Sequence, residues 1–180
     1  TDTSLTLEAL RRGGKPAVEV ADVTFSYDGE RNVLEHCAFT VREGESVTLT
    51  GRTGAGKSTV FKLLLGLYRP RAGAVRIYGA DAASVPPHLR RRLFGYVEQV
   101  FHLVPGTVLD QITLWDDAIS REKAEEAARL VGLHETICGL EQGYDTPCKE
   151  GLFSQGQFQL LAIARAVAAD PAILLLDEIT

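Results

Sequence analysis

The sequence contains no methionine, and cysteine is scarce: the 180 residues include three, at positions 37, 138 and 148. Their spacing fits no metal-binding motif, and an odd, scattered set of cysteines favours reduced thiols in a cytosolic compartment. The first residue is Thr1 rather than methionine, and the chain stops at Thr180, directly after a strongly apolar segment. We therefore expect the sequence to be a part of a longer polypeptide.

Long hydrophobic runs and an excess of positive charge are also missing. No apolar run approaches the ~18 residues that a membrane-spanning helix needs, and the first residues show no signal-peptide pattern. We therefore expect that this segment does not itself cross a membrane. The net charge is −5, which argues against a nucleic-acid partner. The length suffices for one domain with a hydrophobic core, with room for two lobes.

What the sequence does contain is a glycine-rich stretch, Gly51 to Thr59, which reads Gly-x-x-x-x-Gly-Lys-Ser. The residues before it predict a short strand over Ser46–Thr50, and apolar residues at helical spacing after it predict a helix over Lys57–Leu67. A glycine loop between a strand and a helix is the context in which this motif binds phosphates.

The residue types of this loop suit phosphate chemistry. Gly51, Gly54 and Gly56 allow the backbone to turn tightly and to approach an anion without a Cβ in the way. The amides at the start of the helix then face the anion with the positive end of the helix dipole. Lys57 adds a full charge for the β- and γ-phosphates, and Ser58 offers a hydroxyl to Mg²⁺. The alternative is a glycine-rich turn that binds nothing, and the flanking strand and helix disfavour it.

A second set of candidate residues ends the chain. The continuous apolar run Ala172–Leu176 is followed by Asp177 and Glu178, and it predicts a central parallel strand buried on both faces. The two acids would then lie at the carboxyl end of the sheet, where α/β proteins bind ligands. Asp177 can hold Mg²⁺, directly or through water, and Glu178 can orient or deprotonate a water aimed at a γ-phosphate. The alternative is a pair of carboxylates with no role.

Periodicity divides the rest of the chain. Partial alternation predicts strands over four further segments, which are Pro16–Tyr27, Val33–Val41, Ala74–Gly79 and Phe94–Gln99. Helices are expected after Ser120, with Gly132 at the C-terminal cap, and over Phe158–Ala168. The basic run His88–Leu93 predicts a solvated helix face, and the region from Gln99 to Phe153 is expected to be mostly helical.

Three further positions leave alternatives open or favour a plain role. Tyr27 could stack on a purine or pack in the core. The turn Ser154–Gln157 opens a predicted helix and is a second candidate anion site, although a weak one by itself. His102 and Trp115 are interpreted as packing or surface residues rather than ligands.

These patterns predict an α/β fold: a P-loop NTPase core with a parallel sheet, an antiparallel β subdomain and an inserted α-helical subdomain. The predicted boundaries place a linker at 1–15, the nucleotide-binding core with the antiparallel subdomain at 16–98 and the helical subdomain at 99–153. The final segment, 154–180, returns to the core with the last helix and strand.

Taken together, the motifs resemble the nucleotide-binding domain of ABC transporters, over nearly the whole chain from about Ala17, and they look closest to the exporter branch. Gly51–Thr59 is similar to the Walker A loop, Ile173–Asp177 to Walker B and Phe153–Gln157 to the signature motif. The stretches around Gly106-Thr107 and Gly143–Thr146 are also similar to exporter patterns.

The resemblance implies that two such domains pair head to tail around ATP, so that the signature residues of one contact the nucleotide bound by the other. It also implies roles for the matching residues. Residues implied to contact ATP are Tyr27, Gly51, Thr53, Gly54, Ala55, Gly56, Lys57, Ser58, Thr59, Ser154, Gly156 and Gln157. Residues implied at Mg²⁺ are Ser58, Gln99 and Asp177. Residues implied in catalysis are Glu178, Gln99 and Lys57.

The function expected from the resemblance is ATP hydrolysis that powers export, at the cytoplasmic face of the membrane and together with a transmembrane domain that the linker follows. One alternative is a degenerate half-site that binds nucleotide without hydrolysis, and another is an ABC ATPase that acts on DNA or ribosomes. Lys57, Gln99 and Glu178 argue against the first. The 120 residues from Lys57 to Asp177 leave no place for a long coiled coil, which argues against the second.

The sequence departs from the family pattern in three ways. Phe153 and Gln155 replace the usual leucine and first glycine of the signature, and the stretch before Ser154 is about two residues shorter than in exporters. The chain also ends before the family's D-loop and switch histidine. We therefore expect the 180 residues by themselves to be inactive or weakly active.

Overall fold

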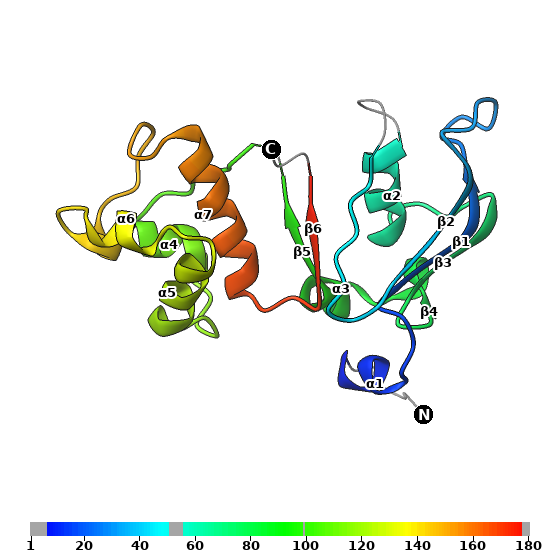
Figure 1. The fold of residues 1–180 in the computed structure, drawn as a ribbon, viewed down its shortest axis with the longest axis horizontal. Coiled ribbons are helices and arrows are strands. Elements are labelled where there is room, and N and C mark those ends of the chain that lie inside the picture. The colour runs from blue at the N-terminus through cyan, green and yellow to red at the C-terminus, as the bar shows by residue number, and fades with distance from the viewer. Residues whose placement is uncertain (1–6, 51–55, 99, 178–180) are drawn as a thin grey trace. The chain divides into compact units, whose positions relative to one another are not determined.

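The computed structural model describes residues 7–50, 56–98 and 100–177 (Figure 1). The chain forms two compact units, Thr1–Leu93 and Phe94–Thr180. Among the described residues, no helix is both long enough and apolar enough to span a membrane.

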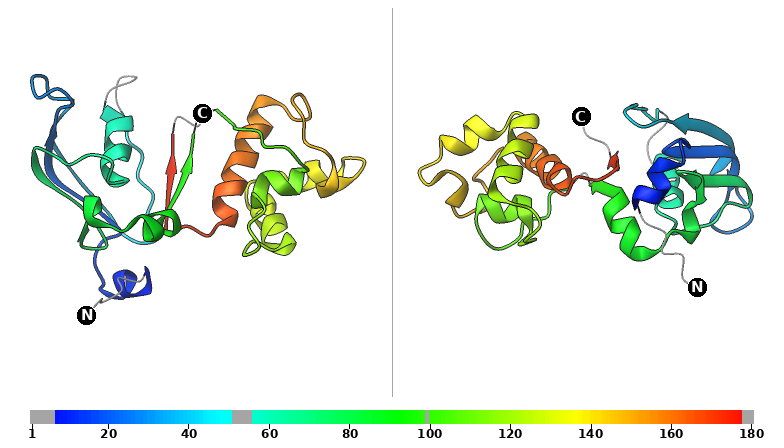
Figure 2. Two further views of the ribbon diagram at one scale, coloured as in Figure 1. Left: turned by 180° about the vertical axis from the view of Figure 1, so that it is seen from behind. Right: turned by 90° about the horizontal axis from the view of Figure 1, so that it is seen from below.

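The first unit is built on a four-stranded antiparallel sheet in the order β2-β1-β3-β4, seen from behind in Figure 2. Its strands are β1 (Val18–Phe25), β2 (Leu34–Val41), β3 (Ala72–Ile77) and β4 (Ala80–Asp81). β1 lies inside the sheet, because Val20 pairs with Phe39 of β2 and with Val75 of β3. The apolar residues that alternate along β1 are buried, which confirms the strand prediction for this segment.

Two irregularities shape β1. At Asp22 the chain has φ 46°, and the pairing with both neighbours shifts register between Val20 and Phe25. Gly73 of β3, with φ +82°, lies directly against this part of β1: a Cβ there would be 2.3 Å from the carbonyl oxygens of Ala21 and Asp22. Only glycine fits such a close approach of two backbones.

The helical elements of this unit are α1 (Leu7–Arg12), α2 (Gly56–Leu64), the 3-10 turn η1 (Ala82–Ser84) and α3 (Pro87–Leu93). α2 confirms the helix predicted after the glycine loop but ends three residues before the predicted Leu67, where Gly66 adopts φ +70°. α1 lies in the predicted linker and buries Leu10. The basic run forms α3, in which Leu89 and Leu93 are buried and His88 and Arg92 are exposed.

The strand predicted over Ser46–Thr50 is wrong: residues 45–50 belong to no helix or strand. An isolated extended segment becomes a strand only through hydrogen bonds to a neighbour. None of the described strands of the first unit pairs with this segment, and Val47 is 47% exposed. The residue types of this segment therefore suit an extended chain, but they do not determine whether a neighbouring strand pairs with it.

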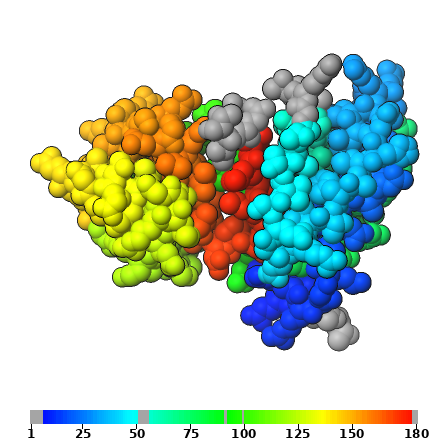
Figure 3. Space-filling model, in the orientation of Figure 1, coloured from blue at the N-terminus to red at the C-terminus, as the bar shows by residue number. Residues whose placement is uncertain are grey.

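The second unit combines two parallel strands with a helical layer. The strands are β5 (Phe94–Val97) and β6 (Ile173–Leu176). The helices are α4 (Val108–Thr113), α5 (Arg121–Leu130), α6 (His134–Cys138), the 3-10 turn η2 (Gly143–Asp145) and α7 (Gln155–Ala168). α7 packs against α4 and α5 (Figure 1). The side chains of α4 to α7 enclose one core, and their atoms form one continuous mass in Figure 3.

The burial predicted for the last strand is wrong in one respect. β6 runs parallel to β5, as expected, but it is not buried on both faces: Leu175 is 6% exposed, whereas Leu174 and Leu176 are 36% and 42% exposed. Among the described residues β6 pairs with a single strand. The apolar run of β6 is therefore covered at Leu175 but not at Leu174 and Leu176.

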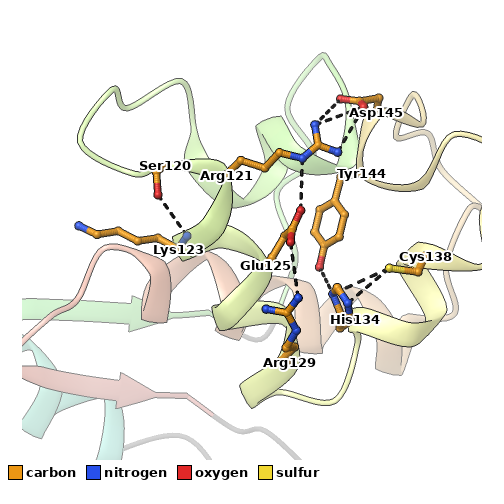
Figure 4. A network of polar contacts seen from close by, with 9 residues as sticks. All are labelled: Ser120, Arg121, Lys123, Glu125, Arg129, His134, Cys138, Tyr144 and Asp145. Atoms are coloured by element: carbon orange, nitrogen blue, oxygen red, sulfur yellow. Dashed lines mark hydrogen bonds and ion pairs between the residues drawn. The ribbon is translucent and has the colours of Figure 1, made fainter.

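A network of polar contacts joins α5, α6 and η2 (Figure 4). Arg121 at the start of α5 pairs with Asp145 of η2 at 3.2 Å, and its guanidinium lies over the ring of Tyr144. The Tyr144 hydroxyl shares a 2.7 Å hydrogen bond with Nδ1 of His134. Burial raises the pKa of Tyr144 to about 12, so this phenol keeps its proton. The contacts fix η2, which contains the exporter-like Gly143–Thr146 stretch, against α5 and α6.

A pH-dependent contact joins the bulged strands of the first unit. Nδ1 of His36, at φ 49° in β2, lies 2.7 Å from Oδ1 of Asp22. The hydrogen bond and the charge of Asp22 raise the pKa of His36 above its usual value of 6.5. Because the folded pKa is the higher one, the contact stabilises the fold fully below pH 6.5, and this contribution is lost as the pH rises through the folded pKa.

We expect Asp22→Asn to return the His36 pKa toward 6.5, measured from the ring proton shifts in an NMR titration, because the substitution removes the carboxylate charge. An unchanged His36 titration in the variant would show that Asp22 does not govern it.

Candidate functional site

The predicted phosphate loop is described only in part. The members outside the described residues are Gly51, Thr53, Gly54 and Ala55. The members that the structure describes form the first turn of α2, and they are Gly56, Lys57, Ser58 and Thr59. α2 has no acidic residue in this turn, so the positive end of the helix dipole and the charge of Lys57 favour an anion together.

Tyr27 lies beside this turn. Its hydroxyl is 2.9 Å from Oγ1 of Thr59, and Lys62 of α2 places its ammonium 5.5 Å from the ring centroid. Two more aromatic rings, those of Phe25 and Tyr68, contact it edge to face with centroids 4.8 and 5.3 Å away. The ring is therefore held by packing, yet 48% of Tyr27 is exposed. Stacking on a purine stays a prediction that this geometry allows.

The signature turn forms the start of α7 in the second unit. The helix begins at Gln155, three residues before the predicted Phe158, because Ser154 is its N-cap. Oγ of Ser154 accepts from the amide of Gln157 at 3.1 Å, and Oε1 of Gln157 accepts from the amide of Ser154 at 3.0 Å. This capping box satisfies two amides that the helix itself cannot. The amides of Gln155 and Gly156, which belong to the same exposed turn, are those left to face an anion.

Asp177 lies at the end of β6, and β5 holds it from two sides. Its amide donates to the carbonyl oxygen of Val97 at 3.0 Å, and the hydroxyl of Tyr96 donates to its Oδ2 at 3.0 Å. Burial and the charge of Asp177 raise the pKa of Tyr96 to about 12, so the phenol acts as the donor. The other two predicted residues of this region, Gln99 and Glu178, lie outside the described residues.

The donor chemistry fits Mg²⁺. Magnesium prefers oxygen ligands and is usually held by one or two carboxylates together with substrate phosphates, not by a cage of protein ligands. Ser58 and Asp177 offer a hydroxyl and a carboxylate. In the described part of the chain, no group of three or more His, Cys, Asp or Glu side chains could hold a metal ion.

One half-buried charge organises the loop that follows Gln99. The guanidinium of Arg165, on α7, donates to the backbone oxygen of His102 at 3.0 Å and to the backbone oxygen of Gln111. Its third bond goes to the side-chain Oε1 of Gln111, a fully buried residue. Oε1 of Gln111 also accepts from the amide of Val104, and its Nε2 donates to the carbonyl oxygen of Val104. Burial lowers the pKa of Arg165. The loop is thus tied to α4 and α7 through side chains.

An aromatic chain ties the signature turn to the same loop. Phe153, which replaces the usual leucine, is 5% exposed and meets Phe158 edge to face at 5.5 Å between centroids. Phe158 stacks on Phe101 at 5.2 Å, and the guanidinium of Arg165 lies 4.5 Å from the centroid of Phe101. The departure at Phe153 therefore has a packing partner in this protein.

A groove of about 600 Å³ lies beside the start of α7. Its lining consists of Val100, Phe101, Leu103, Glu150, Gly151, Gln155, Phe158 and Gln159. The side chain of Gln155, the second departure from the signature pattern, lines this groove and is exposed.

The sequence motifs predict no role for Tyr96 or Arg165, two residues that the structure places in contacts of this region. Arg165 had a signal, since it is the single charged residue of the α7 sequence, and a lone charge in an apolar helix marks a buried contact. Tyr96 had none, because its contact with Asp177 depends on the register of two strands that lie 81 residues apart in the sequence.

The antiparallel sheet, the parallel strands, the helix that follows the glycine loop and the helical layer together define a P-loop ATPase fold of the ABC type. The sequence model of the ABC transporter family matches residues 34–180. The chain belongs to that family.

Its relatives include exporters. The chain is 41% identical, over 91% of its length, to the alpha-hemolysin translocation ATP-binding protein HlyB of Escherichia coli O157:H7, and covers 24% of it. It is 40% identical, again over 91% of its length, to the uncharacterised ABC transporter ATP-binding protein YfiC of Bacillus subtilis (strain 168), and covers 28% of that protein. The chain thus spans about a quarter of the length of these relatives.

A solved structure agrees. The structure of a bacterial Atm1-family ABC exporter with ATP bound matches 91% of the chain with a TM-score of 0.79 and 37% identity, and the chain covers 29% of it. The fold class predicted from the sequence is confirmed, and the chain corresponds to the ATP-binding domain of exporter-type ABC transporters.

The half-buried guanidinium of Arg165 yields a stability prediction. We expect Arg165→Met to lower the free energy of unfolding by about 2–3 kcal/mol, because it removes charged hydrogen-bond donors and takes the guanidinium away from the backbone oxygen of Gln111, a buried residue. Urea denaturation followed by circular dichroism measures the loss. Arg129→Met is the matched control: Arg129 is exposed and pairs with Glu125 on the surface, so its change should stay within about 1 kcal/mol. Equal effects would contradict the structural role of Arg165.

Proposed function

We propose that this chain hydrolyses ATP as the motor of an exporter-type transporter, in a head-to-tail pair of two such domains that drives a transmembrane domain. The observation that carries the proposal is the start of α2 at Gly56, directly after the glycine run, with Lys57 and Ser58 in an acid-free first turn. The names of the relatives, which include a probable multidrug resistance ATP-binding/permease protein of Bacillus subtilis (strain 168), support the membrane partner. A place at the cytoplasmic face of the membrane is part of the same proposal.

In this proposal each half of the chain has its own task. The first turn of α2 and the loop before it bind the phosphates, and Tyr27 stacks on the adenine. The start of α7, with Ser154, Gly156 and Gln157, serves the nucleotide of the partner copy through the two free amides of its first turn and the Ser154 hydroxyl. ATP then stabilises the closed pair by adding contacts across the interface, and hydrolysis removes them.

The catalytic roles are assigned by chemistry. Glu178 orients or deprotonates the attacking water, Gln99 contacts that water, and Lys57 stabilises charge on the transferred phosphoryl group. Ser58, Gln99 and Asp177 would hold Mg²⁺, which supplies charge neutralisation at the phosphates when bound.

The domain boundaries at residues 15, 98 and 153 remain part of the proposal. The surface that contacts the transmembrane domain is also part of the proposal, and we assign the groove beside α7 to it. The lining of this groove includes Val100, which is 66% exposed and directly follows Gln99.

Lys57→Ala tests the phosphate site. Removing the ammonium should weaken ATP binding about 10- to 100-fold, the range expected for a charge-assisted hydrogen bond. The measurement is a titration of the chain with Mg-ATP by calorimetry. Lys123→Ala removes the same charge from α5 and should leave the affinity unchanged. Wild-type affinity in a folded Lys57→Ala protein would refute the phosphate-loop assignment.

Glu178→Gln separates hydrolysis from binding. In a full-length version of the protein we expect this variant to keep ATP affinity and to reduce phosphate release by about 10²- to 10⁴-fold, the usual contribution of a general base. Both quantities are measured in the same samples. Hydrolysis at the wild-type rate would remove Glu178 from this role. Wild-type binding without any hydrolysis, even in the presence of a partner copy and the transmembrane domain, would favour the degenerate half-site.

A further inference from the structure

The pairing of β5 with β6 places Tyr96 and Asp177 on one face of the parallel sheet. Tyr96 lies opposite Leu175 in the register, and paired residues of neighbouring strands share a face. Asp177 follows Leu175 by two residues, so it returns to that same face. The long phenol then reaches one step along β6, and its hydroxyl meets Oδ2 of Asp177 at 3.0 Å.

The hydrogen bond from Tyr96 engages one of the two carboxylate oxygens of Asp177. An ionised carboxylate accepts hydrogen bonds and donates none, and the phenol is the donor here. With Oδ2 engaged by Tyr96 and the backbone amide of Asp177 bonded to Val97, both the main chain and the side-chain rotamer of Asp177 are set. The second carboxylate oxygen can then be presented to a cation in one orientation.

We propose that Tyr96 is a positioning residue for Mg²⁺ binding, whose hydroxyl holds the Asp177 carboxylate in the orientation that the cation requires. The inference rests on the proposed function, since it needs Asp177 to be the magnesium carboxylate. Residues that orient a metal ligand through a hydrogen bond typically contribute about 10- to 100-fold to metal affinity.

The alternative is that Tyr96 serves only in packing, which would depend on a different part of its side chain. Tyr96 is 39% exposed in a two-stranded sheet, and packing would require its ring and not its hydroxyl. Tyr96→Phe keeps the ring and removes the hydroxyl, so it separates the two roles. Tyr144→Phe is the matched control, because it removes a hydroxyl of the same unit that bonds His134.

The test measures metal binding directly. Mn²⁺, which replaces Mg²⁺ and is visible by electron paramagnetic resonance, is titrated into the chain saturated with a non-hydrolysable ATP analogue. We expect Tyr96→Phe to weaken Mn²⁺ binding about 10- to 100-fold, while affinity for the metal-free analogue stays within about twofold of wild type. Tyr144→Phe should bind Mn²⁺ as wild type does, and Asp177→Asn should weaken it at least as much as Tyr96→Phe.

The outcomes separate the failure of this inference from that of the proposed function. Wild-type Mn²⁺ affinity in Tyr96→Phe, with a loss in Asp177→Asn, overturns the role of Tyr96 alone. A loss of metal-free nucleotide binding in Tyr96→Phe overturns it too, since the hydroxyl would then serve the fold. No nucleotide-dependent Mn²⁺ binding by the wild-type chain, or no effect of Asp177→Asn, overturns the proposed metal site itself and this inference with it.

Discussion

Every α-helix starts with amides that its own hydrogen bonds cannot satisfy, and the two helices that begin at motifs in this chain meet that constraint differently. α7 satisfies two of these amides internally, through the reciprocal bonds of Ser154 and Gln157. α2 begins at Gly56 with Lys57 next in sequence and no acid in its first turn. The physical expectation is a strong anion site at α2, where dipole and charge add, and a weaker one at α7, where only part of the turn remains available.

The second unit depends on α7 for more than its first turn. The guanidinium of Arg165 bonds backbone oxygens of the loop after Gln99 and of α4, and an unpaired buried carbonyl would cost free energy if that guanidinium moved away. The loop and the helix that begins with the signature turn are therefore held as one body. A displacement of either by a nucleotide or by a partner would be passed to the other through these contacts, because packed groups have few alternative arrangements.

The sequence predicted the elements whose signal is local. α5 is predicted by its apolar face opposite a charged face and by Ser120, whose hydroxyl caps the helix. β1 is predicted by the partial alternation of its apolar residues. The hydrophobic pattern predicts the start of α7 three residues too late. The polar residues of the capping box, Ser154 and Gln157, are typical of a turn, so the pattern does not include them in the helix. The strand predicted over Ser46–Thr50 and the full burial predicted for β6 are wrong for the same reason. The residue types of a segment indicate an extended chain, whereas strand pairing and burial depend on neighbours that are distant in the sequence. The contact of Tyr96 with Asp177 could not be predicted for the same reason, since the two residues lie 81 positions apart in the sequence.

The departures from the usual signature motif are consistent with a turn that works through its backbone. Gln155 is the first residue of α7, and its side chain lies in the groove, so its amide can still face an anion as the amide of a glycine would. Phe153 is larger than leucine, and its added surface is covered by the edge contact with Phe158. Through Phe101 this stack continues to the guanidinium of Arg165. The larger residue therefore strengthens the tie between the signature turn and the loop after Gln99, at a position where leucine would offer no aromatic edge.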